Sequence, residues 1–198
     1  MGRPKLPRDI ARESAAQWER WLTEHYLSAD GPYGGTPIKF LDATPAELAA
    51  AARQEGWTEE DAKRSFVESF DPAAVRNWLS GDGARRTDGQ VPGYFRYLVL
   101  TCFVASSGDG TETTNNFRIR LGQILGVGGP FNSVSGVNKL WKSLAGWCNS
   151  RREAGDPIRE LILPDPRPMR LIGCAVRLAF PAWRDRLAFA RILGSRLN

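Results

Sequence analysis

The residue types that most often perform chemistry in proteins are few and scattered in this chain. It has a single histidine, His25, and three cysteines, Cys102, Cys148 and Cys174. A zinc site needs about four ligands from such residues, and a nucleophilic dyad needs a base beside the nucleophile. Neither a cysteine nor a second histidine is close to His25 in the sequence. We therefore expect a surface or interface histidine, with no metal site and no cofactor.

The cysteines lie among apolar residues, as in "LTCFV" and "LIGCAV". This context favours buried thiols in a reducing compartment over a disulfide framework. The longest apolar run, "LVLTCFVA", is much shorter than the roughly 20 residues that span a bilayer. The basic start "MGRPKLPR" leads into a charged segment without an apolar leader region. These features predict a cytoplasmic protein that does not enter the membrane.

Two glycine-rich segments could hold phosphate, and one acidic pair could serve a nuclease. The segments "GDGTETTNN" and "GVGGP" lack the Gly-Lys-Ser/Thr sequence of a P-loop, and proline interrupts the second. Asp156 and Glu160, with Lys142, have the composition of a nuclease triad but no characteristic spacing. We expect a protein that is not an enzyme, and keep a nuclease as the minor alternative.

Basic residues are concentrated in the second part of the chain. Residues 1–116 contain 13 Lys or Arg and 17 Asp or Glu, whereas residues 117–198 contain 14 and 5. Twelve of those 14 are arginine, whose planar guanidinium suits phosphate groups. This pattern predicts a nucleic-acid-binding face, with DNA favoured over RNA. The candidate phosphate contacts are Arg118, Lys142, Arg151, Arg152, Arg159, Arg167, Arg170 and Arg184.

Three other uses of these cations stay open. They could form an ordinary solvated surface, or bind an acidic protein partner. They could also pair with the carboxylates of the chain's own acidic first part. The short basic arm at residues 1–8 contains "GRPK", which is similar to arms that bind the minor groove of DNA, although a flexible tail is the simpler interpretation.

The first part of the chain has the pattern of several short helices. Apolar residues between positions 9 and 27 have helical spacing. Thr44, Thr58 and Asp71 are predicted N-caps, and each is followed by proline or acidic residues in the first turn. Residues 9–80 are therefore predicted as an acidic helical subdomain, and the glycine-rich residues 81–93 as a linker.

The second part, residues 94–198, is predicted as a basic helical subdomain. Residues 94–107 are apolar nearly all round, which indicates a buried helix, and further helices are predicted from residues 117 and 137. The turn "PDPRP" between two apolar runs predicts a small β-hairpin near residues 158–178. The expected fold is mainly α, a compact helical domain or domains with a C-terminal hairpin. The order helix, hairpin, helix is similar to winged-helix folds.

Residues 91–193 also resemble a helical region of large bacterial proteins encoded in anti-phage defence and DNA-processing gene clusters. The resemblance rests on "PGYFRYLVLTCFVASS", "NNFRIRLGQILG", "LWKSLAGWCN" and "LIGCAVRLAF" before a helix with "RDR". These are packing and capping motifs, so the resemblance implies a context of defence or DNA handling and no particular reaction.

The sequence thus predicts a non-catalytic subunit that binds nucleic acid or serves assembly, gripping phosphates with its arginine-rich second part. The alternative is a protein–protein adaptor of a larger complex. Its anchors would be the tryptophans of the first part, because aromatic side chains dominate many interfaces. They are Trp18, Trp21, Trp57 and Trp78.

Overall fold

The structure is a computed structural model that describes residues 8–38, 41–52, 54–80, 90–106, 114–131 and 137–163. This part of the chain is mainly helical, as the sequence predicts, and it contains isolated β-bridges but no strands. The predicted hairpin near 158–178 falls outside the described residues from 164 onward. The helices are α1 (Arg8–Leu22), the π-helix η1 (Thr23–Leu27), α2 (Pro45–Ala52), α3 (Glu59–Glu68), α4 (Pro72–Ser80), α5 (Tyr94–Ser106), α6 (Thr114–Ile124) and α7 (Val137–Glu153).

The helix starts predicted from the capping residues Thr44, Thr58 and Asp71 are confirmed, whereas the helix predicted from residue 117 begins earlier, at Thr114. Thr58 and Asp61 form a reciprocal capping box, in which each side chain accepts from the other residue's amide, at 3.2 and 3.1 Å. The Thr44 hydroxyl accepts from the amide of Glu47 at 3.2 Å. Asp71 accepts from the amide of Ala73 at 3.0 Å. Local sequence therefore decides where α2, α3 and α4 begin.

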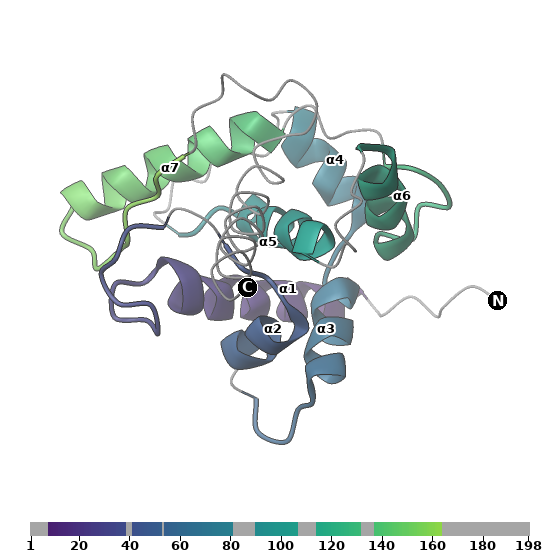
Figure 1. Cartoon of the computed structure of the whole chain (residues 1–198), viewed down its shortest axis with the longest axis horizontal. Coiled ribbons are helices and arrows are strands. Elements are labelled where there is room, and N and C mark those ends of the chain that lie inside the picture. Colours follow the sequence, from purple (N-terminus) through teal and green to yellow (C-terminus); the bar gives the residue numbers. More distant parts are fainter. Residues whose placement is uncertain are drawn as a thin grey trace, which may run out of the picture.

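Helix α5 lies at the centre, between two layers of helices (Figure 1). On one side α1 packs against α5, and α2 and α3 pack against α1. On the other side α4, α6 and α7 each contact α5, and α4 also contacts α7. Every residue from position 94 to position 104 is buried, so the prediction of a helix buried on most sides is confirmed. No helix of the described residues combines the length and the apolar character that a membrane span requires.

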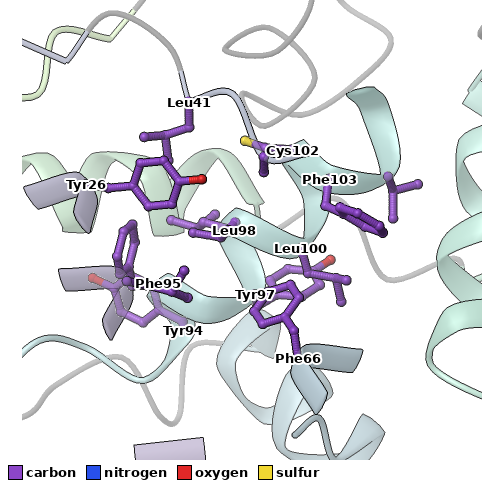
Figure 2. Close-up of a cluster of buried hydrophobic side chains, with 14 of the residues drawn as sticks. Tyr26, Leu41, Phe66, Tyr94, Phe95, Tyr97, Leu98, Leu100, Cys102 and Phe103 are labelled. Atoms are coloured by element: carbon purple, nitrogen blue, oxygen red, sulfur yellow. The ribbon is translucent and has the colours of Figure 1, made fainter. Parts of the chain in front are cut away.

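A single hydrophobic core joins the two layers. Figure 2 shows how side chains of α5, among them Tyr97 and Leu98, gather with Tyr26 and Phe66 from the first part of the chain. The same cluster includes Trp141 of α7. The acidic and basic parts of the sequence therefore do not have separate cores among the described residues.

A buried arginine also crosses between the two predicted subdomains. Arg96 of α5 donates from Nη1 to the carbonyl oxygen and the hydroxyl of Ser69, at 2.6 and 2.7 Å. Its Nε lies 3.5 Å from a carboxylate oxygen of Glu19 on α1, and its guanidinium lies over the ring of Phe70, 4.9 Å from the centroid. A buried charge is tolerated only with such partners. Arg96 therefore has a structural role.

The extended segment after α7 is held between two earlier parts of the chain. Residues 157–159 bond to the end of η1, and residues 160–162 bond to residue 38 on their other side. The backbone hydrogen bonds are Ala29 N to Pro157 O and Arg159 N to Leu27 O, both 2.7 Å, Ile38 N to Glu160 O, 2.7 Å, and Ile162 N to Ile38 O, 2.8 Å. The segment thereby ties residues 27–38 to the end of α7.

Candidate nucleic-acid interface

The charges of the sequence separate by layer in the fold. Helices α4, α6 and α7 contain seven Lys or Arg and one Asp or Glu. Helices α1, η1, α2 and α3, on the other side of α5, contain five Lys or Arg and nine Asp or Glu. The packing of α4, α6 and α7 on one side of α5 thus turns a difference along the sequence into a difference between two faces of the molecule (Figure 1).

Helix α7 presents exposed cations along its outer face. Its apolar residues, among them Leu140, Trp141 and Leu144, are buried against the core. Lys139, Lys142 and Arg152 are exposed. Between the lysines and Arg152 the exposed positions are small or polar, so a polyanion could approach the helix backbone closely.

In the part of the chain that the structure describes, no carboxylate pairs with Lys139, Lys142 or Arg152. Lys139 lies in the first turn of α7, where the positive end of the helix dipole adds to its charge. The helix dipole does not stabilise a cation at this end, so Lys139 and the helix terminus together favour an external anion.

Arg151 is only partly available. Its Nε forms an ion pair with a carboxylate oxygen of Asp156, just after the end of α7. The amide of Asp156 donates to the carbonyl oxygen of Arg151 at 3.0 Å, which fixes the turn that carries the carboxylate. Asp156 is also a member of the candidate nuclease triad, and this ion pair engages its carboxylate. Arg152 has no such carboxylate partner among the described residues.

Arg159, a predicted phosphate contact, is a structural residue. It is 6% exposed, and its guanidinium donates to the carbonyl oxygens of Thr36 and Tyr26 at 2.7 and 2.9 Å. It also lies over the ring of Tyr33, 5.3 Å from the centroid. The sequence pattern suggested an exposed loop cation. In the structure, the side chain instead points toward residues 26–36, where it is buried.

The α6 cations lie on the same layer as α7. Arg118 is half-buried, and its Nε is enclosed without a hydrogen-bond partner. Arg76 of α4, which the sequence analysis did not select, is exposed and its guanidinium lies 6.0 Å from the centroid of the Phe131 ring. Its omission follows from its place in the acidic part of the sequence. The remaining candidates, Arg167, Arg170 and Arg184, lie outside the described residues.

His25 is buried, so the prediction of a surface or interface position is wrong. It is 3% exposed, and its Nε2 lies 2.8 Å from a carboxylate oxygen of Glu47. The same oxygen accepts from the hydroxyl of Tyr33. The Tyr33 ring is stacked on Tyr26 and packs edge-to-face on His25. Burial and the neighbouring Glu47 raise the pKa of Tyr33.

This cluster connects with Arg159 through Tyr33, and it gathers polar residues from four separate segments. These side chains form a hydrogen-bond network that fixes residues 28–37 on η1 and α2. Within it, the buried Nδ1 of His25 has no hydrogen-bond partner among the described residues. The sequence carried no signal for it, because its members are far apart in the chain.

The described cysteines and tryptophans are mostly core residues, and Cys174 lies outside the described residues. Cys102 and Cys148 are buried free thiols, and burial raises the pKa of Cys148 to about 12. Among the proposed adaptor anchors, Trp18 is fully buried and Trp21 and Trp78 pack against the core. Trp57 is the exposed one, at 37%. In the described residues, no group of three or more His, Cys, Asp or Glu side chains is arranged to hold a metal ion.

Comparisons with protein-family models, with curated proteins and with solved structures find no match to this chain.

Proposed function

We propose that this chain is a non-catalytic nucleic-acid-binding subunit, which contacts the phosphate backbone through the face formed by α4, α6 and α7. The observation that carries the proposal is the set of exposed cations on α7, Lys139, Lys142 and Arg152, which have no carboxylate partner among the described residues. The resemblance of residues 91–193 to proteins of defence and DNA-processing clusters suggests the context in which such a subunit would act.

The dimensions of α7 suit this role. Lys139 and Arg152 are separated by 13 residues, or about 20 Å along a helix. Adjacent phosphates of one DNA strand are about 3.4 Å apart along the duplex axis, so the helix is long enough to reach several of them. Lys and Arg contacts to phosphate position a protein without reading bases. Binding is therefore proposed to depend little on sequence.

The proposal predicts a strong dependence on salt. If Lys139, Lys142, Arg152 and Arg118 each neutralise one phosphate, the logarithmic slope is about −3.6, and a fourfold rise in salt lowers affinity about a hundredfold. Fluorescence anisotropy of short labelled duplexes and single strands, DNA and RNA, over a salt series measures this slope. Binding that is absent or independent of salt would contradict the proposal.

Two double variants that remove the same charge distinguish the effect of a local binding face from the effect of the protein's net charge on affinity. The double variant Lys139→Gln/Lys142→Gln removes two contacts, and we expect the slope to become shallower by about 1.8. The control Lys63→Gln/Arg64→Gln removes the same charge from α3 in the opposite layer, where Lys63 pairs with Glu60 at 3.0 Å. An equal loss of affinity in both variants would show that only net charge matters, and would refute the proposed face.

The adaptor and nuclease alternatives are distinguished in the same preparation. Cleavage of labelled nucleic acid after addition of magnesium would support the nuclease. Stable association with a larger protein, without salt-dependent binding of nucleic acid, would support the adaptor. In that case the exposed Trp57, which packs edge-to-face on Trp21, is the residue to substitute first.

A further inference from the structure

A short glycine-rich loop, residues 126–130, follows α6 and folds back along it. The amide of Val127 donates to the carbonyl oxygen of Gly122 at 3.0 Å. The amide of Phe131 donates to the carbonyl oxygen of Arg118, one turn earlier, at 2.9 Å. The loop therefore runs antiparallel to the last turns of α6 and ends beside Arg118.

The path of this loop requires glycine at several positions. Gly126 and Gly128 have φ values of +66° and +71°, in the left-handed region that favours glycine. A Cβ atom on Gly122 of α6 would lie 1.8 Å from the carbonyl oxygen of Gly129. The glycines are thus explained by a specific backbone arrangement, which the sequence motif alone did not reveal.

Two consecutive backbone amides of the loop have no acceptor among the described residues. Those of Val127 and Phe131 are bonded to α6, whereas those of Gly128 and Gly129 are paired with no group of the described residues. Gly128 is exposed. Neighbouring free amides around a left-handed residue are typical of backbone sites for anions.

Two arginines from different helices contact Phe131, the residue that follows this loop, Arg118 through its carbonyl oxygen and Arg76 through its guanidinium. The guanidinium of Arg76 on α4 lies over the Phe131 ring. Arg118 precedes Gly122 by four residues, so both lie on the face of α6 that the loop covers. The Nε of Arg118 is enclosed and has no hydrogen-bond partner among the described residues. An anion could therefore meet this guanidinium only through its terminal nitrogens, Nη1 and Nη2, by charge-assisted hydrogen bonds.

We propose that the loop at residues 126–130, with Arg76 and Arg118, is a phosphate-binding subsite on the α4–α6 part of the basic face. The amides of Gly128 and Gly129 and the two guanidinium groups donate to phosphate oxygens. This inference rests on the proposed function, because it names where on that face one backbone phosphate of a nucleic acid sits. The loop follows a helix, and has no Lys of the P-loop type, so it differs from a nucleotide-binding loop.

The test is a titration of the isotope-labelled full chain with inorganic phosphate at constant ionic strength, followed by amide correlation spectra. We expect saturable shifts of the Gly128 and Gly129 signals. In Arg118→Gln and in Arg76→Gln we expect the phosphate affinity to fall about tenfold each, as for the loss of one charged hydrogen bond. Arg76 is exposed, so its variant keeps the fold even if the Arg118 variant does not.

The control is Lys63→Gln, which removes the same charge from α3 in the opposite layer and should leave the phosphate titration unchanged. The subsite would be overturned if the Gly128 and Gly129 signals did not shift with phosphate, or if the same shifts persisted in both arginine variants. Salt-dependent duplex binding in that same protein would leave the proposed function standing. Shifts of the two amides without any duplex binding would instead support the subsite and overturn the proposed function.

Discussion

At the scale of single residues, two arginines are buried, and their guanidinium groups bind to groups of the protein itself. Arg96 and Arg159 both donate to backbone carbonyl oxygens and both lie over aromatic rings. Burial of an arginine depends on such partners, which come from segments distant in sequence. Composition alone cannot separate these residues from Lys139 or Arg152, because the charge is the same and only the surroundings differ.

We predict that Arg159→Lys destabilises the protein by about 2 kcal/mol. One ammonium cannot replace the two guanidinium nitrogens that donate to the carbonyl oxygens of Thr36 and Tyr26. Arg152→Lys, on the exposed face, should change stability by less than about 0.5 kcal/mol. Urea unfolding measures both. Affinity of the folded Arg159→Lys protein for DNA should equal that of the wild type. A selective loss of DNA affinity would mean that Arg159 reaches phosphate after all.

At the scale of the elements, the helix starts depend on local hydrogen bonds. The side chain and amide of Thr58 donate to Asp61, and these bonds lower the pKa of Asp61. A depressed folded-state pKa stabilises the protein above the unfolded value, about 3.9, and this contribution is lost as the pH falls through the folded pKa. The cap of α3 should therefore contribute to acid sensitivity.

Thr58→Ala should cost about 1 kcal/mol at neutral pH by removing the capping box. The pKa of Asp61 should rise toward its ordinary value, so the difference in stability between variant and wild type should shrink in acid. Urea unfolding at neutral and acidic pH, with carboxyl resonances followed by NMR, measures both effects. Ser150→Ala on the exposed face of α7 is the control. A difference that stays constant with pH would contradict this assignment.

At the scale of the whole molecule, the two layers share one core around α5. Trp18, Phe66 and Trp141 belong to the same cluster of buried side chains, and Arg96 connects α5 with α1. A shared core of this kind unfolds as one unit in most small single domains. The charge boundary in the sequence is therefore a boundary between surfaces, and does not divide the core.

We accordingly predict a single cooperative unfolding transition. Tryptophan fluorescence, which reports on both layers, and far-ultraviolet circular dichroism should give the same urea midpoint within error. Arg96→Met, which removes the connection to Glu19 and Ser69, should lower that midpoint without splitting the transition. Two separate midpoints in the wild type would indicate independent acidic and basic subdomains.

Local patterns in the sequence determined the mainly helical class, the N-caps at Thr44, Thr58 and Asp71, and the burial of α5, because propensity, capping and periodicity act between residues close along the chain. The tertiary structure alone decided which cations stay exposed. It buried Arg159 and His25, paired Arg151 with Asp156, and brought Arg76 into the basic layer. The physical reason is that the partners of a charged side chain are set by packing between distant segments, which no local pattern specifies.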